Sequence, residues 1–458
     1  MSERSPTITV LTDGENQRPD GPDGPHKPGI TRRGALSGAA LLGIGAGLDH
    51  VLDRGSKIVA KGSQASLKST YSGRGRGASA APAEQFTPFY GAHQGGITTT
   101  AQDYLSFAAF DLVSDAVEDL RALLERWTAA AASLTVGRPY EPAPQKLSVP
   151  PLDPGEAIGF SPSQLTVTVG FGATLFRASS TGGAGLSERR PTRLSALPPF
   201  AGEAIDPSRS GGDICVQACA NDPQVAFHAV HLFAKLAAGV ARLRWSQLGF
   251  GRTASTTRVQ VTTRNLMGFK DGTDNIRAEE TAAVERYVWV QPGDGPAWMT
   301  GGTYLIARRI RILFDRWDAT SLDEQQRTIG RDKFTGAPLG LAHEYDRVDL
   351  QATEPNGELA IPLDAHIRLA NPANNAGQRI LRRGYSYAEA SEFGSDELDA
   401  GLFFIAFQRD PQTQFVPLQA RLAASDALNR HTLVTSSSIF ACPPGPREGG
   451  FIGDALFA

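Results

Sequence analysis

Cysteine and net charge are both scarce in this chain of 458 residues. Its three cysteines, Cys215, Cys219 and Cys442, are too few and wrongly spaced for a disulfide framework or for a zinc site of the Cys-Cys-His-His kind. Cys215 and Cys219 lie four residues apart in a segment that we predict as a helix, where buried structural thiols are the expected role. The 45 basic and 48 acidic residues leave a net charge of −3, so no global field attracts nucleic acid or an anionic membrane.

A hydrophobic run long enough to cross a membrane is also missing near the start of the chain. The segment Thr31–Ser37 carries paired arginines, and the uncharged sequence that follows ends at Leu48, about 15 residues against the roughly 20 that a membrane helix needs. This order is typical of a twin-arginine export signal. We therefore predict a signal region at 1–48, a flexible linker at 49–85, a periplasmic, extracellular or cell-envelope location, and no stable membrane span in the mature chain.

Hydrophobic periodicity divides the remaining chain into strands and helices. Apolar residues alternate or run together in four predicted strands, at 104–111, 165–169, 304–313 and 402–408. Apolar residues at helical spacing predict four helices, at 112–132, 223–243, 321–329 and 418–429. The succession of strand and helix returns in the second half, so two halves of like design are expected. Strands mixed with helices, without a regular βαβ rhythm, favour an α+β fold.

The segment Gly268–Asn275 reads Gly-Phe-Lys-Asp-Gly-Thr-Asp-Asn and places Asp271 between glycines in a predicted tight turn. Glycine permits φ > 0 and lets the backbone come close to a bulky ligand, so the carboxylate can point into a pocket. A polar hairpin turn would use the same residues, and the motif alone does not separate the two readings. A calcium loop is disfavoured, because the acidic residues of this segment miss the EF-hand spacing.

Further segments resolve this ambiguity, because they accompany the Asp271 motif in order along the chain. Together with that motif they make the chain resemble the dye-decolourising peroxidases, and in particular the secreted deferrochelatase/peroxidase subfamily associated with bacterial iron uptake. The resemblance extends from about Phe86 to Ala458, and several motifs in order are far more specific than any one of them. The segments are Pro88–Ile97, Gly330–Gly340, His366–Pro372, Leu381–Tyr387 and Gly401–Asp410.

The resemblance implies two ferredoxin-like halves, each an antiparallel sheet faced by helices, at 86–260 and 261–458, with haem b (iron protoporphyrin IX) in the C-terminal half. The implied activity is that of a peroxidase, which uses hydrogen peroxide to oxidise dyes, phenolics or other electron donors through an oxyferryl intermediate. Two alternatives stay open: a deferrochelatase, which releases iron from haem and keeps the porphyrin intact, and a non-catalytic haem-binding or haem-delivery protein. Homo-oligomers and partner proteins of an iron-uptake system are further expectations.

A haem peroxidase needs an iron ligand, an acid/base on the opposite side of the haem, and a positive group that stabilises charge when the O–O bond breaks. By resemblance, His366 is the proximal iron ligand, Asp271 the distal acid/base and Arg382 the distal cation. Arginine suits the last role because it keeps its charge and donates several hydrogen bonds. Its neighbour Arg383 is the rival. The presence of both Asp271 and Arg382 argues against mere haem storage.

Four more residues complete the expected haem site. Asp426 matches the position of an acidic acceptor for the second nitrogen of the proximal histidine, which raises the basicity of that ligand. Arg308 is a candidate partner for a haem propionate, and a solvated strand residue is the alternative. Phe403 or Phe404 is expected over the distal haem face, with ordinary core packing as the alternative.

Two further pairs of residues are candidates for a function on weaker sequence signals. Tyr385 and Tyr387, near Arg382, are candidates to carry radical equivalents to bulky substrates at the surface. His228 and His231 lie three residues apart on a predicted helix and could form a metal-binding face. A helical pair without a carboxylate at the right spacing more often serves surface or packing roles.

Overall fold

The computed structural model describes residues 86–141, 147–177, 186–390 and 398–458. The predicted signal region and linker, 1–48 and 49–85, lie outside these described residues. Within the described ranges, no helix is both long enough and apolar enough to cross a membrane.

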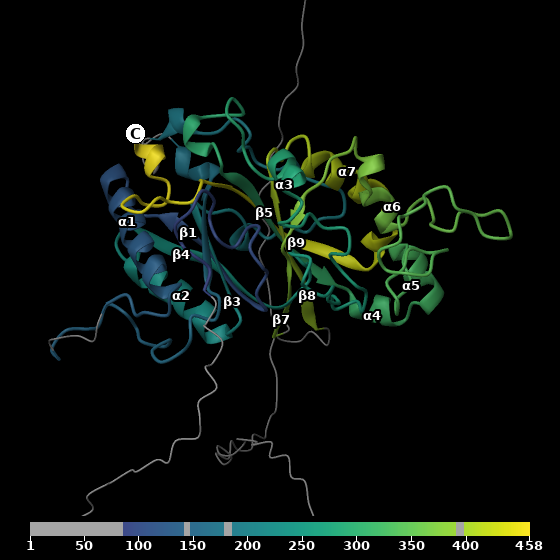
Figure 1. Cartoon of the computed structure of the whole chain (residues 1–458), viewed down its shortest axis with the longest axis horizontal. Helices are drawn as coiled ribbons and strands as arrows, with labels where there is room; N and C mark the ends of the chain where they lie inside the picture. The colour runs from purple at the N-terminus through teal and green to yellow at the C-terminus, as the bar shows by residue number, and fades with distance from the viewer. Residues whose placement is uncertain (1–85, 142–146, 178–185, 391–397) are drawn as a thin grey trace, which may run out of the picture. The chain divides into compact units, whose positions relative to one another are not determined.

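The N-terminal half is built on four antiparallel strands in the order β2-β3-β1-β4. These strands are β1 (Tyr104–Leu112), β2 (Thr166–Gly172), β3 (Ile214–Ala220) and β4 (Ala241–Arg252). Two amphipathic helices, α1 (Val117–Leu134) and α2 (Pro223–Leu236), bury their apolar faces on one side of these strands (Figure 1).

The C-terminal half repeats this strand order as β9-β5-β8-β7, with the short β6 also paired to β8. Its strands are β5 (Thr303–Ile312), β6 (Leu381–Arg382), β7 (Tyr385–Glu389), β8 (Asp399–Gln408) and β9 (Thr432–Cys442). If the short β6 is left out of the count, the first strand of each half lies between the third and the fourth, which gives two ferredoxin-like halves in an α+β fold.

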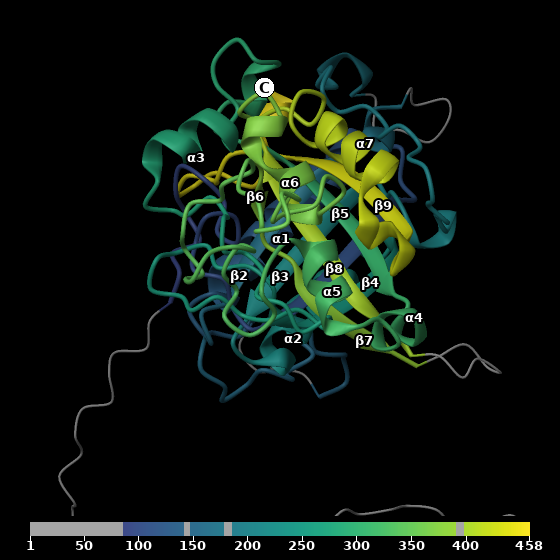
Figure 2. The same ribbon diagram turned by 90° about the vertical axis from the view of Figure 1, so that its right-hand side faces the viewer.

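Two helices of the C-terminal half, α6 and α7, lie on the outer side of this sheet, and Figure 2 shows them in front of β5 and β8. Its helices are α3 (Thr281–Tyr287), α4 (Phe314–Asp318), α5 (Leu322–Ile329), α6 (His366–Ala370) and α7 (Phe415–Ser425). The predicted helix at 321–329 is confirmed as α5, with Ser321 as its N-cap accepting the amide hydrogen of Glu324.

Two short seams join the halves into a closed sheet. Phe171 and Gly172 of β2 pair with β9, and Phe250 of β4 pairs with Ser386 of β7. The closed sheet surrounds an apolar core to which both halves contribute. Phe107 is fully buried in this core and contacts the rings of Trp245, Phe403 and Phe440.

The structure corrects several predicted bounds. The helix predicted at 112–132 begins only at Val117, and the one predicted at 223–243 ends at Leu236, because Gly239 takes φ 82° and the chain then enters β4. The helix predicted at 418–429 is displaced towards the N-terminus, at Phe415–Ser425, and a separate 3-10 turn, Ala427–Arg430, follows it.

Cys215 and Cys219 lie in strand β3 and not in a helix. A spacing of four residues places side chains on one face in a strand as well as in a helix, so the spacing could not distinguish them. Both thiols are fully buried in the enclosed core, as is Cys442. The expectation of buried thiols is confirmed, whereas the predicted helix is wrong.

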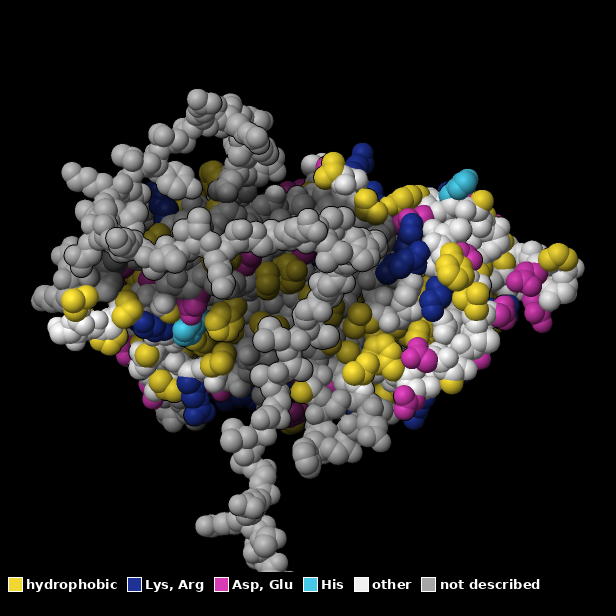
Figure 3. Space-filling model, turned by 90° about the horizontal axis from the view of Figure 1, so that it is seen from below, with side chains coloured by type: hydrophobic (Ala, Val, Ile, Leu, Met, Phe, Trp, Pro, Cys, Tyr) yellow, Lys and Arg dark blue, Asp and Glu magenta, His cyan; other side chains and the backbone are white. Residues whose placement is uncertain are grey.

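Basic and acidic side chains are interspersed with hydrophobic ones on the face shown in Figure 3. This distribution is in keeping with the near-balance of charges in the sequence.

The enclosed core predicts a large effect of one truncation. Phe107→Ala should lower the free energy of unfolding by about 3–5 kcal/mol, because it leaves a cavity between the two halves. Phe334→Ala, at an exposed position, is the matched control and should change it by less than about 0.5 kcal/mol. Urea unfolding of both variants measures the difference, and equal stabilities would contradict a core shared by the halves.

Candidate functional site

His366 begins the short helix α6 and is held from one side by a carboxylate. Its Nδ1 lies 2.6 Å from Oδ2 of Asp426, which is almost fully buried, whereas the histidine side chain is 35% exposed. The other Asp426 oxygen accepts the amide hydrogen of Leu428 and so caps the turn that follows α7. An imidazole that donates through Nδ1 keeps the lone pair of Nε2 for a metal.

The electrostatic surroundings of His366 contain three other groups of the expected site. Burial opposes the protonated form, but the charge and hydrogen bond of Asp426 outweigh it and raise the pKa of His366. Asp271 also raises this pKa and Arg382 lowers it. The charges of Asp426, Asp271 and Arg382 thus all act on one imidazole, although these residues are up to 155 positions apart in the sequence.

Asp271 lies on a loop whose shape depends on two glycines. Gly268 and Gly272 have φ of 86° and 91°, which is the left-handed region that favours glycine. A Cβ added to Gly272 would come within 2.8 Å of the Cα of Ala254, so this glycine is also required by close packing. The carboxylate of Asp271 accepts a hydrogen bond from Nδ2 of Asn265 at 3.2 Å.

Arg382 reaches this loop from strand β6. Its Nη1 lies 2.5 Å from Oδ1 of Asp271. Asn275 fixes the backbone of Arg382 from both sides, because its Oδ1 accepts the amide hydrogen and its Nδ2 donates to the carbonyl oxygen, each at 2.8 Å. The Asp271 loop and the arginine strand therefore form one unit.

The side chains of the adjacent Arg382 and Arg383 lie in different environments. The guanidinium of Arg383 is buried and donates to the carbonyl of Thr100 at 3.1 Å and to Oε1 of Gln102 at 2.5 Å. Arg382 and not Arg383 meets Asp271.

Strand alternation separates the two candidate phenylalanines in the same way. Phe403 faces the enclosed core, where its ring lies 5.3 Å from that of Phe107. Phe404 faces the outer side, where its ring lies 6.2 Å from that of Phe415 at the start of α7. Arg308 pairs with Phe404 across β5 and β8 and shares this outer side. Core packing therefore describes Phe403, and Phe404 lies on the helix-covered face.

Arg308 is not a solvated strand residue, because its side chain is only 1% exposed. One of its nitrogens, Nη2, forms an ion pair with Glu203. Its Nε and Nη1 are buried and have no hydrogen-bond partner among the described residues.

Tyr385 and Tyr387 lie in the enclosed core and are fully buried. Burial raises the pKa of both phenols. Neither ring reaches the surface, so a bulky donor could not touch either of them directly.

The other histidines that the structure describes have local roles. His93 stacks on Trp289 with ring centres 3.8 Å apart, and its Nδ1 lies 2.7 Å from the carbonyl oxygen of Gly301. His228 and His231 share a carboxylate partner, Glu156, that the helix pattern did not reveal.

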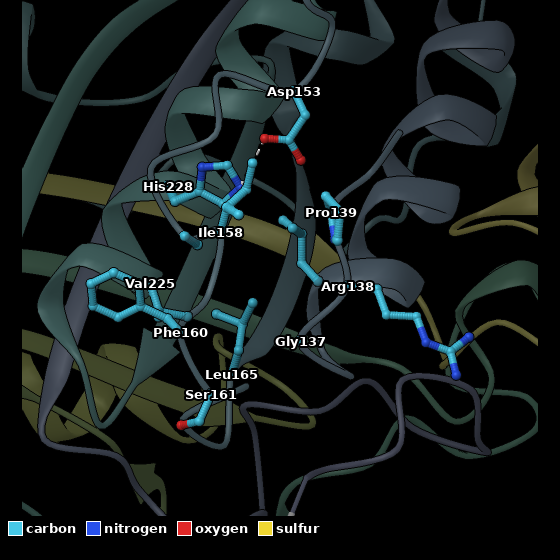
Figure 4. Close-up of a pocket in the computed structure, with 12 residues that line it drawn as sticks. Gly137, Arg138, Pro139, Asp153, Ile158, Phe160, Ser161, Leu165, Val225 and His228 are labelled. Atoms are coloured by element: carbon cyan, nitrogen blue, oxygen red, sulfur yellow. Dashed lines mark ion pairs between the residues drawn. The ribbon is translucent and has the colours of Figure 1, made fainter. Parts of the chain in front are cut away.

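Figure 4 shows His228 beside Asp153 in a small pocket of about 20 Å³, between α1, α2 and the loop that follows α1. The described residues contain no group of three or more His, Cys, Asp or Glu side chains that could hold a metal ion.

Two residues of the site carried no role in the sequence analysis, Asn265 and Asn275. Asn275 lies within the quoted motif, and Asn265 lies six residues before Asp271. The signal in the sequence that could have indicated a role for them is that both are short polar side chains close to a glycine-containing turn. Their partners Arg382 and Asp271 become visible only in the folded chain.

A groove of about 570 Å³ opens beside the Asp271 loop. It is lined by Thr273 and Asp274 of that loop and by Asn371 and Asn374, just after α6. It therefore lies between the loop that carries Asp271 and the segment that follows His366.

Comparisons with known proteins agree with this geometry. The Dyp-type peroxidase N-terminal and C-terminal family models match residues 94–251 and 262–447. A dye-decolorizing peroxidase of Thermobifida fusca is 38% identical over 450 residues, which cover 94% of this chain and 98% of that protein. The chain belongs to the DyP-type peroxidase family.

Other members of the family are similar to the chain over most of its length. A deferrochelatase of Escherichia coli strain K12 is 37% identical over 377 residues, which are 81% of this chain and 86% of that protein. The solved structure of ferric DtpA from Streptomyces lividans is 39% identical with a TM-score of 0.74, covering 82% of this chain and 98% of that one. DyP-type peroxidases are haem enzymes, so the cofactor of this oxidoreductase is a haem.

The residues of the site fit this cofactor. His366 offers a nitrogen whose partner atom is already held by Asp426. The unpartnered nitrogens of Arg308 suit an anionic group such as a haem carboxylate, because buried donors without acceptors are costly. Phe404 and Phe415 supply apolar ring surface on the same side of the sheet.

The contact between His366 and Asp426 generates a prediction about haem affinity. His366→Ala should abolish stoichiometric haem binding, because it removes the ligand. Asp426→Asn should weaken haem binding about 10- to 100-fold, because the amide orients the imidazole less firmly and leaves it less basic. Haem titration of the apoprotein, followed by absorbance, measures both, with the exposed Asp364→Asn as control. Wild-type affinity in both variants would exclude His366 as the ligand.

Proposed function

We propose that the chain is an exported haem b peroxidase that reduces hydrogen peroxide and oxidises dyes, phenolics or similar donors. One observation carries the proposal: the Asp271–Arg382 pair lies within electrostatic reach of the His366 imidazole that Asp426 holds. Haem storage alone requires a ligand, but it requires neither an acid/base nor a cation on the opposite side.

When bound, haem supplies the iron at which peroxide is reduced and to which the donors give their electrons. His366 would hold the haem iron through Nε2. Asp426 keeps Nδ1 as the protonated nitrogen and fixes the orientation of the ring, so the imidazole would be an electron-rich ligand.

Asp271 is placed to move the proton. Its carboxylate takes a proton from hydrogen peroxide and returns it to the oxygen that leaves, which is the work of a general acid/base. Arg382 donates to the same region and stabilises the negative charge that develops when the O–O bond breaks. Asn265 holds the carboxylate of Asp271 in position, and Asn275 holds the backbone of Arg382.

The groove beside the Asp271 loop is the route that we assign to peroxide and small donors. It is open to solvent and lined mainly by polar residues, among them Asp274, Arg331 and Gln351. A bulky dye that does not fit the groove would have to give up its electron at the surface.

A deferrochelatase is the second candidate, because a deferrochelatase is 37% identical to this chain over most of its length. Both activities would use the same haem site. They differ in the product, since iron release leaves protoporphyrin IX, whereas the peroxidase leaves haem intact and an oxidised donor.

Export by the twin-arginine route is part of the proposal and rests on the sequence Thr31–Ser37. Self-association and partners from an iron-uptake system remain predictions from the family.

The acid/base and cation roles are tested by rapid mixing with hydrogen peroxide. Asp271→Asn and Arg382→Leu should each bind haem like the wild type but react with peroxide at least about 100-fold more slowly. Stopped-flow absorbance of the haem band measures the rate. Asp115→Asn, an exposed position just before α1 and outside the site, should react at the wild-type rate.

Unchanged rates in both Asp271→Asn and Arg382→Leu would reject these roles. A wild-type protein that binds haem, ignores peroxide and releases protoporphyrin IX would favour the deferrochelatase.

Export is tested in cells. Replacing Arg32 and Arg33 by Lys should keep the protein in the cytoplasm, because the paired arginines are the recognised feature of the signal. Cell fractionation and immunoblotting locate the protein, with Arg18→Lys as the control. Export of the double variant would remove the twin-arginine assignment.

A further inference from the structure

The surroundings of Arg308 are unusual for a charged side chain. The guanidinium lies over the ring of Phe200 at 5.4 Å and over that of Phe415 at 5.6 Å. Phe404 faces it from the neighbouring strand. Burial lowers the pKa of Arg308, and the charge of Glu203 works against this effect.

Glu203 is the carboxylate partner that the structure gives to this arginine. One carboxylate oxygen meets Nη2 of Arg308, and the other accepts the amide hydrogen of Phe200 at 3.2 Å. Glu203 thus closes a turn of its own segment and binds Arg308 with the same side chain.

The segment 197–206, which we name the strap, comes from the N-terminal half but is attached to the C-terminal half. The amide of Ala204 donates to the carbonyl of Val434 at 2.9 Å, and that of Asp206 donates to the carbonyl of Thr435 at 2.8 Å. Both acceptors lie in β9. The strap therefore crosses between the halves and follows the edge of the second sheet.

The strap lies at one end of α7, and the iron ligand is held at the other end. Phe200 packs edge-to-face on Phe415, the first residue of α7, with ring centres 6.3 Å apart. Asp426, which holds His366, directly follows Ser425, the last residue of α7. The 11 residues of α7 extend about 16 Å, so the strap and the carboxylate that holds His366 lie at opposite ends of one short helix.

We propose that Glu203 ties the strap over the edge of the haem site through Arg308, and that this tie limits the rate at which haem enters and leaves. The unpartnered Nε and Nη1 of Arg308 are the atoms that a haem carboxylate would meet at this edge. The inference rests on the proposed haem-binding function.

The test compares haem exchange in the wild type and in Glu203→Gln. Glutamine keeps an oxygen that can accept the amide hydrogen of Phe200, but it removes the charge that holds Arg308. Haem loss to an excess of an apomyoglobin acceptor and haem uptake by the apoprotein should both become about tenfold faster, the size expected for one charge-assisted hydrogen bond. The ferric absorbance spectrum should not change, because His366 is untouched.

Two variants serve as controls. Glu188→Gln removes an exposed carboxylate of the N-terminal half that lies outside the strap, and it should exchange haem at the wild-type rate. Glu203→Asp keeps the charge and should restore much of the slow exchange, which loss of packing alone would not explain.

Unchanged exchange in Glu203→Gln would overturn the proposal. Faster loss with unchanged or slower uptake would also overturn it, because Glu203 would then add affinity without restricting passage. A wild-type protein that binds no haem in the same titration would instead reject the proposed function itself, so the two failures are distinguishable.

Discussion

The closure of the sheet is the constraint on which the rest of the structure depends. Because the two halves join at two seams, each strand of the C-terminal sheet has one side towards the enclosed core and one side towards the helices. Side chains alternate between these sides, so a shift of one residue would exchange their environments. This alternation separates Phe403 from Phe404.

The charged groups of the site follow the same constraint. On β5, Arg308 faces the helix-covered side, whereas Arg309 lies over the ring of Tyr387 and pairs with Asp399. Arg382 meets Asp271 and the adjacent Arg383 is enclosed. Partly exposed ion pairs such as Asp271–Arg382 contribute only about 0–1 kcal/mol to stability, so the importance of this pair lies in where it puts the two groups.

The two halves make unequal contributions to the site. The C-terminal half carries His366, the Asp271 loop and Arg382, whereas the N-terminal half contacts Arg308 through the strap. Phe200 and Glu203 thus connect the first half to α7 and to Arg308. These two side chains therefore attach a segment of the first half to the helix-covered side of the second.

The sequence by itself determined the family, through the resemblance of several motifs in order along the chain. It also determined the α+β class, because strand alternation and helical spacing are local patterns. Its predicted elements were correct in kind, but Cys215 and Cys219 show the limit, since a spacing of four residues suits a strand and a helix equally. Only the tertiary structure decided between the adjacent Phe403 and Phe404, which lie on opposite sides of β8. It alone revealed the partners Asn275 and Glu203. These contacts join residues about 105 positions or more apart, and no local pattern encodes such pairings.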